Sequence, residues 1–164
     1  MYKRQVFGSL PFLLSASEFT LSEAFFESMS GITTTGATII SDLDNSPKSI
    51  LLWRAIMQWL GGIGIVVMAI TILPLLKVGG MQLFKMEGPD STEKILPRTI
   101  QVATIIISTY IALTFFCGLF YWIFGMTIFD SICHAMTTIA TGGFSTHNDS
   151  IGFFKNSNIE IIAS

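Results

Sequence analysis

The sequence predicts an all-α integral membrane protein in which one unit occurs twice: a helix, a short re-entrant helix, a polar loop and a returning helix. Only 12% of the 164 residues are charged, whereas soluble domains carry about a quarter. Two uncharged stretches are long enough to cross a bilayer. A stretch rich in threonine and glycine interrupts the apolar sequence and recurs 107 residues later. Together these observations favour helices in a bilayer over a soluble fold.

Three apolar stretches lie between charged residues. Residues 55–76 form an uncharged run of 22 residues and residues 99–129 form one of 31, and about 20 residues suffice for one spanning helix. The first stretch, residues 5–17, is too short to cross and lacks the small-residue cleavage pattern of a signal peptide. We therefore expect residues 5–17 to be the outer end of a helix whose beginning is missing.

Two short helices are expected after the apolar stretches. Thr20, followed three residues later by Glu23, forms a capping box and predicts a helix over residues 20–32. The same spacing of Thr127 and Asp130 predicts a helix over residues 127–139, with a shorter acid that reaches the cap less well. Neither helix is long enough to cross a bilayer, so each should enter and leave by the same face, as a pore helix does.

A loop of threonine and glycine follows each short helix, at residues 33–38 and 140–146. Non-helical backbone at membrane depth is tolerated only where it is buried in protein or lines a watery cavity. Glycine lets carbonyl oxygens turn inward, and threonine hydroxyls add ligands or brace the loop. The partially negative end of each short helix also favours a cation. These loops therefore have the composition of a site for a dehydrated monovalent cation.

The remaining elements complete two repeats. In the first, over residues 6–76, the opening helix is truncated and the returning helix is expected over residues 47–76, with Pro47 at its first position. Three glycines should let neighbouring helices approach it closely: Gly61, Gly62 and Gly64. In the second, over residues 96–164, the opening helix is expected over residues 96–124 and the returning helix is truncated.

The linker between the repeats, residues 77–95, is expected to be cytoplasmic. Its basic residues, with one just beyond its end, are Lys77, Lys85, Lys94 and Arg98. The loops on the opposite side carry Asp42, Asp44 and Asp149 against Lys48 and Lys155. Because an excess of lysine and arginine marks the cytoplasmic side, residues 77–98 should lie inside and both Thr/Gly loops should face outward.

An offset of 107 aligns residues 20–48 with residues 127–155, and seven of the 29 pairs are identical. The identical pairs are Thr20/Thr127, Met29/Met136, Ile32/Ile139, Thr34/Thr141, Gly36/Gly143, Asp42/Asp149 and Lys48/Lys155. Because the matches fall on caps, helix ends and loop glycines, we interpret the two segments as a diverged internal repeat.

Three motifs in this chain resemble the potassium-transporting membrane subunits of the bacterial Trk system, in the wider Trk/Ktr/HKT cation transporter superfamily. They are "AFFESMSGITTTGAT", "QWLGGIGIVVMAITILPLLKVGGMQLF" and "TIATGGFSTHNDSIGFF". The resemblance runs from about Val6 to Ile162. It implies four helix–pore-helix–filter-loop–helix repeats around one K⁺-channel-like pore, of which this chain would hold the first two. The third and fourth repeats, and the gating loop of the third, have no counterpart here, and "MYKRQ" does not resemble the family.

The resemblance also implies the site. Gly36 and Gly143 would be the filter glycines, and glycine at both positions looks potassium-like, because a serine there accompanies sodium preference in plant relatives. K⁺ would be held by backbone carbonyls of a selectivity filter made of Thr33, Thr34, Thr35, Gly36, Ala140, Thr141, Gly142 and Gly143. No covalently bound cofactor is implied. The implied partners are the lipid bilayer of the bacterial inner membrane, a second copy of the full-length subunit, and a cytoplasmic nucleotide-binding regulatory subunit.

For several polar side chains, the sequence leaves more than one role open. Arg54, one helical turn from Gln58, either extends to the interface or pairs with Glu23 or Glu27. Asp42 and Asp149 either concentrate cations at an outer vestibule or merely solvate their loops. A hydrogen-bonded role in the short helix is expected for His134, an outer position for His147, and buried free thiols for both cysteines.

Potassium transport is the leading function, and two alternatives remain. One is a smaller cation channel completed by pairing of two such chains, and the other is a non-conducting membrane fragment. Nucleic-acid binding has no support, because no basic run with interleaved aromatic residues occurs. An enzyme is not expected, since no metalloprotease motif or nucleophile–base spacing occurs either.

Overall fold

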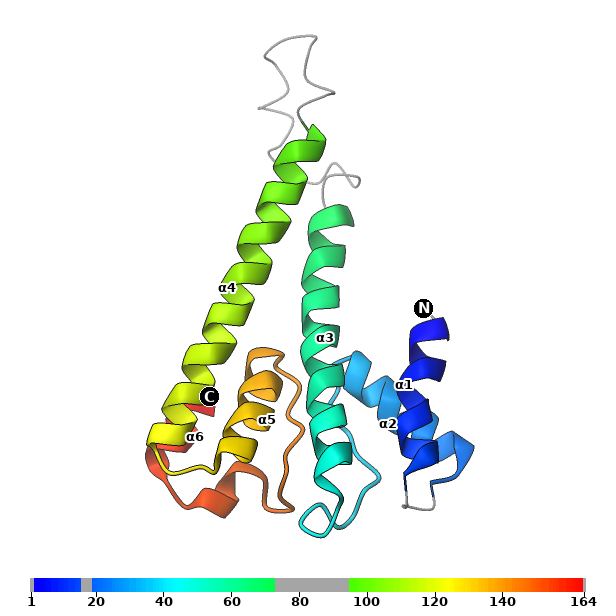
Figure 1. Ribbon diagram of the computed structural model, residues 1–164, viewed down its shortest axis with the longest axis vertical. Helices are drawn as coiled ribbons and strands as arrows, with labels where there is room; N and C mark the ends of the chain where they lie inside the picture. Colours follow the sequence, from blue (N-terminus) through cyan, green and yellow to red (C-terminus); the bar gives the residue numbers. More distant parts are fainter. Residues whose placement is uncertain (1, 16–18, 73–94, 164) are drawn as a thin grey trace.

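The computed structural model describes residues 2–15, 19–72 and 95–163, and within these ranges every regular element is a helix. The helices of these ranges follow one another along the chain, and Figure 1 labels the α-helices. They are α1 (Tyr2–Leu14), α2 (Leu21–Ile32), α3 (Lys48–Ile72), α4 (Ile95–Ile123), α5 (Ile128–Ile139), the 3₁₀ helix η2 (Ser150–Phe154) and α6 (Ser157–Ala163). An all-α fold was predicted, and it is confirmed for the described residues.

The long helix α3 stands between two pairs of helices (Figure 1). On one side α1 packs against the short helix α2, and on the other α4 packs against the short helix α5. Both short helices contact α3 near the end at which it begins, and the loops that follow them lie beside it. Helix α3 therefore contacts the short helix of both halves of the chain.

Two of the described helices are long and apolar enough to cross a membrane, over Lys48–Met68 and Gln101–Ile123. They lie within the helices expected over residues 47–76 and 96–124. The second is mostly exposed in the isolated chain, and large apolar side chains such as Phe115 and Ile123 cover its surface. A bilayer would solvate such a surface, whereas water would not. Of the expected linker at residues 77–95, residues 77–94, with Lys77, Lys85 and Lys94, lie outside the described residues, and residue 95 begins α4.

Both short helices begin at the predicted threonines. Thr20 Oγ1 accepts a hydrogen bond from the backbone N–H of Glu23 at 3.3 Å, and Glu23 Oε2 accepts one from the N–H of Thr20 at 2.8 Å. At α5, Thr127 Oγ1 likewise accepts a hydrogen bond from the backbone N–H of Asp130. The Asp130 carboxylate, however, accepts from the Thr127 hydroxyl at 2.6 Å and not from the Thr127 backbone N–H. The full capping box at α2 and the partial one at α5 confirm the prediction.

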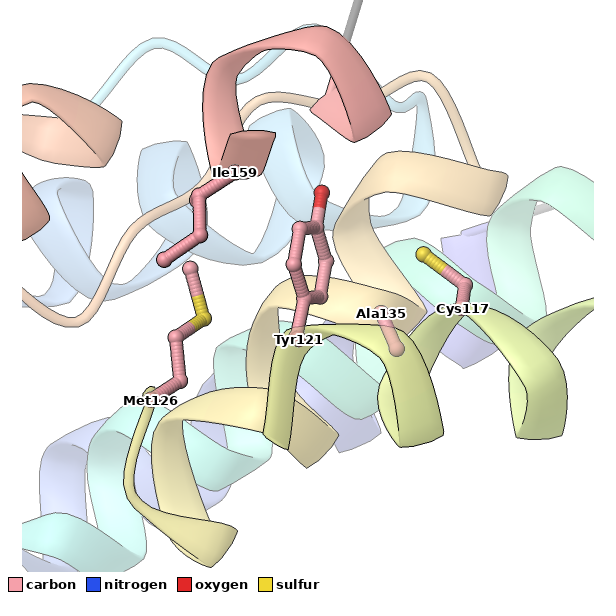
Figure 2. Close-up of a cluster of buried hydrophobic side chains, with 5 residues drawn as sticks. All are labelled: Cys117, Tyr121, Met126, Ala135 and Ile159. Atoms are coloured by element: carbon pink, nitrogen blue, oxygen red, sulfur yellow. The ribbon is translucent and has the colours of Figure 1, made fainter. Parts of the chain in front are cut away.

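Each half of the chain has a small apolar core. In the second half, buried side chains of α4, α5 and α6 meet at Cys117, Tyr121, Met126, Ala135 and Ile159 (Figure 2). In the first half, Phe12, Ala24, Ile50 and Met57 join α1, α2 and α3. Cys117 and Cys133 are buried free thiols, as predicted. These cores fix the short helices against their long neighbours.

The three glycines of α3 differ in their surroundings. Gly61 lies against the backbone of Ile32, at the end of α2, so closely that a Cβ atom would overlap the Ile32 carbonyl. A Cβ atom on Gly62 would likewise lie too close to the Tyr110 hydroxyl and to Ala140. No described atom lies within 4 Å of a Cβ placed on Gly64. Close helix approach was predicted for all three, and it occurs at Gly61 and Gly62 but not at Gly64.

The Gly61→Ala substitution is expected to destabilise the complete protein by about 1–3 kcal/mol, because the added methyl group meets rigid backbone where α2 ends. Thermal unfolding of the detergent-solubilised protein, followed by size-exclusion chromatography, would measure the change. The matched control is Gly64→Ala, in the same helix with open space around it. Equal melting temperatures for the two variants would contradict this packing.

Candidate ion-binding loops

The two Thr/Gly loops, residues 33–38 and 140–146, have the same backbone path. Thr34 and Thr141 have φ angles of 56° and 52°, and Gly36 and Gly143 have φ angles of 78° and 77°. Both pairs are related by the offset of 107 that aligns the sequences. The left-handed region costs a threonine roughly 1–2 kcal/mol. Non-glycine residues held there cluster at functional sites, so the strained threonines mark these loops as candidates.

Each loop is fastened to the end of its short helix by the same three backbone hydrogen bonds. In the first loop, the N–H groups of residues 33, 34 and 35 donate to the carbonyls of residues 29, 31 and 30, at distances of 2.9–3.0 Å. In the second, the N–H groups of residues 140, 141 and 142 donate to the carbonyls of residues 136, 138 and 137, at 2.9–3.2 Å. These bonds satisfy the last carbonyls of each helix and set the start of each loop.

Several loop carbonyls remain available to a ligand. The carbonyls of Thr33 and Ala140 accept the hydroxyl of the following threonine at 2.7 Å. Within the described ranges, a further set accepts no hydrogen bond: the carbonyls of Thr34, Thr35, Gly36, Thr141 and Gly143. Bare carbonyl oxygens are the ligands that replace the hydration shell of K⁺ in selectivity filters.

The two loops touch at their glycines. A Cβ atom on Gly36 would overlap the carbonyl oxygen of Gly142 in the other loop. With the left-handed φ of Gly36, this close approach leaves room for glycine alone. The expected filter residues of both repeats are therefore brought together at one place.

Gln58, on α3, binds the second loop directly. Its Nε2 donates to the Gly142 carbonyl at 2.8 Å, and its Oε1 accepts from the N–H of Phe144 at 3.1 Å. The Gly142 carbonyl, expected among the filter ligands, is therefore held by a buried side chain. The sequence analysis noted the position of Gln58 but missed this contact, because nothing local links residues 84 positions apart.

Arg54, one turn before Gln58, pairs with Glu27 of α2. Arg54 Nε lies 2.7 Å from Glu27 Oε1, and the two side chains are 1% and 0% exposed. Arg54 Nη1 also donates to the Ser145 carbonyl at 3.3 Å, and its guanidinium lies 4.0 Å from the ring centroid of Phe144. Of the alternatives for Arg54, pairing with Glu27 is confirmed, while Glu23 serves as the helix cap. One α3 side chain thus contacts both repeats.

Glu27 and His134 hold equivalent places, 107 residues apart. Glu27 accepts hydrogen bonds from the Thr38 hydroxyl at 2.8 Å and from the N–H of Ile39 at 3.2 Å. His134 Nε2 lies 3.1 Å from Ser145 Oγ, and its Nδ1 lies 2.9 Å from the Asp130 carbonyl. The hydrogen-bonded role predicted for His134 is confirmed. In both repeats, the short helix braces the chain that leaves the loop.

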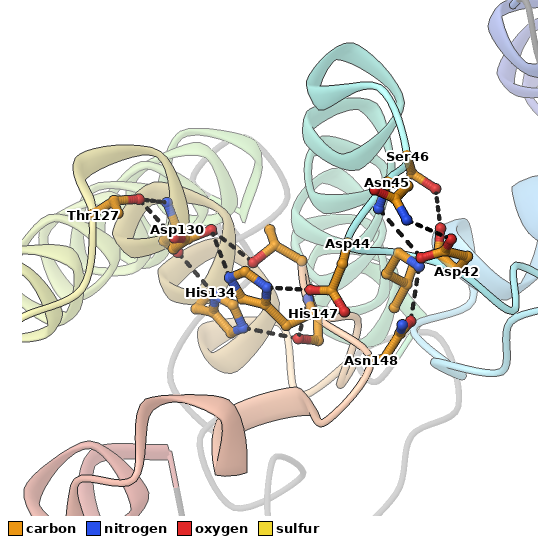
Figure 3. Close-up of polar contacts among 12 residues, drawn as sticks. Asp42, Asp44, Asn45, Ser46, Thr127, Asp130, His134, His147 and Asn148 are labelled. Carbon is orange, nitrogen blue, oxygen red and sulfur yellow. Dashed lines mark hydrogen bonds and ion pairs between the residues drawn. The ribbon is translucent and has the colours of Figure 1, made fainter.

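Asp42 and Asp149, paired in the sequence alignment, differ in structure. Asp42 stabilises the turn that it begins (Figure 3). Its carboxylate accepts hydrogen bonds from the side-chain amide of Asn45 at 2.8 Å and from the backbone N–H of Asn45 at 3.3 Å. These hydrogen bonds hold the pKa of the Asp42 carboxyl below its usual value. Asp149 precedes η2, is exposed, and makes no capping bond with its side chain. The structure gives Asp42 a local role in its turn and assigns none to Asp149.

His147 connects the segments that follow the two Thr/Gly loops (Figure 3). Its Nδ1 lies 2.6 Å from Asp44 Oδ1 and its Nε2 lies 3.6 Å from Asp130 Oδ1. The ring stacks on Phe153 with the ring centroids 3.7 Å apart. Beside it, Asn148 Oδ1 accepts the N–H of Leu43 at 2.8 Å. The sequence analysis placed His147 on the outer side but did not find these partners.

Side-chain metal ligands are not grouped in the described residues, where no set of three or more His, Cys, Asp or Glu residues could hold a metal ion. The unoccupied loop carbonyls are neutral backbone oxygens, the kind of ligand that K⁺ takes in selectivity filters.

The Arg54–Glu27 pair is expected to show strong coupling in a double-mutant cycle. Arg54→Met or Glu27→Leu alone should destabilise the complete protein by about 3–5 kcal/mol, because each leaves an uncompensated buried charge. The double variant should cost clearly less than the two changes added together. Thermal unfolding in detergent measures all three.

Glu23→Gln is the matched control for this cycle, since Glu23 is an exposed acid on the same short helix. Glu23→Gln should change the free energy of unfolding only slightly, and by the same amount in the parent and in the Arg54→Met variant. Additive effects of Arg54→Met and Glu27→Leu would contradict the buried pair.

The chain is similar to known proteins along most of its length. The family described as TrkH, cation transport protein, matches residues 1–164. The chain is 48% identical over 158 residues to the Trk system potassium uptake protein TrkH of Vibrio parahaemolyticus, and 49% identical over 158 residues to that of Escherichia coli K12. It is 48% identical over 148 residues to TrkI of Halomonas elongata. Each match covers 90–94% of this chain.

A solved structure is similar throughout. The crystal structure of the potassium transporter TrkH from Vibrio parahaemolyticus superposes with a TM-score of 0.83 at 43% identity, and the match covers 98% of this chain and 31% of that one. The chain spans about a third of the length of the curated relatives it matches, at 30–33%. The matched family consists of membrane proteins that transport cations, and not of enzymes. This chain belongs to the TrkH family of cation transport proteins.

Proposed function

We propose that the complete protein containing these residues transports K⁺ across the bacterial inner membrane, through a pore lined by backbone carbonyls of its Thr/Gly loops. One observation carries the proposal: two loops of matching backbone touch at Gly36 and Gly142 and present carbonyls that no described group occupies. The names of the relatives, Trk system potassium uptake proteins, support the choice of ion.

The proposed mechanism needs no covalent step. A K⁺ ion loses its water at the outer mouth and passes between carbonyls such as those of Thr34, Gly36, Thr141 and Gly143. The last turns of α2 and α5 lead directly into the loops, so the partially negative helix ends lie next to the ion. The backbone hydrogen bonds between each loop and its helix support a fixed arrangement of these carbonyls.

The proposed assembly extends beyond this chain. Its two loops would form half of a four-repeat pore, with the loops facing outward and the linker at residues 77–98 on the cytoplasmic side. Two complete subunits would associate with a cytoplasmic nucleotide-binding regulatory subunit. The basic residues of the linker support this orientation. The exposed flanks of α1, α2 and α5 support further packing partners within the complete protein.

The complete protein is expected to restore growth at low K⁺ to bacteria that lack their own potassium uptake systems. The 164 residues alone should not, because they supply two of the four proposed loops. Growth and ⁸⁶Rb⁺ uptake would be measured together with the amount of inserted protein. Failure of the complete protein, when it is inserted in normal amounts, would contradict potassium transport. Selective uptake by the 164 residues alone would contradict the four-loop pore.

The Gly36→Ser substitution should lower the K⁺/Na⁺ uptake ratio by about tenfold, since strain of roughly 1–2 kcal/mol enters a loop that already touches Gly142. Gly143→Ser should weaken discrimination less, because it adds the same strain where no atom lies within 4 Å of the new Cβ. Gly152→Ser, in exposed η2 with open space, is the matched control. An unchanged ratio in Gly36→Ser would reject the loops as the selectivity filter.

A further inference from the structure

We propose that Gln58, on the returning helix of the first repeat, is a positioning residue that sets K⁺ over Na⁺ selectivity by holding the second loop. This inference rests on the proposed function and adds a selectivity determinant outside the loops. The observation behind it is a single buried amide bonded to two backbone groups on either side of the filter glycine Gly143.

The Gln58 amide and the loop backbone form a closed ring of hydrogen bonds. Nε2 donates to the Gly142 carbonyl at 2.8 Å while Oε1 accepts from the Phe144 N–H at 3.1 Å. Gly143 lies between these two points with a φ of 77°. Because both its neighbours are fixed by one rigid planar group, Gly143 cannot rotate freely and the direction of its carbonyl is set.

The loop sequence is fitted to this amide. A Cβ atom at Gly142 would overlap the carboxamide of Gln58, so the loop has glycine where the first loop has Thr35. The side chain of Gln58 is fully buried, at 0% exposed, and water therefore does not compete for its hydrogen bonds.

Arg54 places the amide. It lies one turn before Gln58 on α3, is tied to Glu27 of α2, and donates to the Ser145 carbonyl just beyond the loop. The second loop is therefore held at residues 142, 144 and 145 by a helix of the other repeat. The selectivity of the second loop thus depends on the first repeat, and a change in α3 reaches the ion through loop geometry.

The test compares K⁺ and Na⁺ uptake by the complete protein carrying Gln58→Met or Gly142→Ala. Methionine has a similar length and loses both hydrogen bonds, while the alanine methyl displaces an intact Gln58 amide. Each variant should lower the K⁺/Na⁺ uptake ratio at least about fivefold, since a buried carbonyl and N–H lose their partners. Gln101→Met, at an exposed position on α4, is the matched control and should keep the parental ratio.

The outcomes separate this inference from a structural role and from the proposed function. A structural role would reduce the inserted protein and both ion fluxes in proportion, leaving the ratio unchanged, and that result overturns the inference. A ratio within about twofold of the parent in both variants, at normal protein amounts, also overturns it. If Gly36→Ser lowers the ratio while Gln58→Met and Gly142→Ala do not, the filter assignment stands and only the role of Gln58 fails. If Gly36→Ser also leaves it unchanged, the filter assignment itself fails.

Discussion

The buried ion pair between Arg54 and Glu27 holds the two repeats together. It joins α3 to the short helix of the first repeat, and the same guanidinium reaches the Ser145 carbonyl in the second. Two charges with 1% and 0% exposure are stable only as partners, since neither can recover its hydration. The pair therefore fixes how α3 lies against both loops. From that position Gln58 meets the backbone of the second loop.

This support is needed because the loops are not stable in isolation. Thr34 and Thr141 are in the left-handed region, and several carbonyls lack partners among the described residues. Strain and unpaired polar groups persist only where the surroundings fix the backbone. Here the fixation comes from three directions: the end of the short helix, the Glu27 or His134 brace, and α3. The loop carbonyls therefore stay free of internal hydrogen bonds, and the proposed K⁺ ion can bind to them.

Local features of this structure could be predicted from the sequence, and contacts distant in the chain could not. The caps at Thr20 and Thr127 depend on residues three positions apart. The loop glycines recur at a constant offset of 107 residues, which is visible in the sequence. By contrast, the Gln58 contact joins residues 84 positions apart and His147 meets Asp44 across 103. The sequence also does not distinguish Gly64 from Gly61 and Gly62. The difference between them appears only when the helices packed against α3 are known.

The central claim, that carbonyls of these two loops bind K⁺, is tested most directly by locating the ion. Anomalous diffraction from crystals of the complete protein, grown with Rb⁺ or Tl⁺ in place of K⁺, would show where a monovalent cation binds. If these carbonyls bind K⁺, a peak will lie between the loops, within coordination distance of carbonyls such as those of Thr34, Gly36, Thr141 and Gly143. Ordered loops with no peak between them, and a peak elsewhere along the pore, would contradict it.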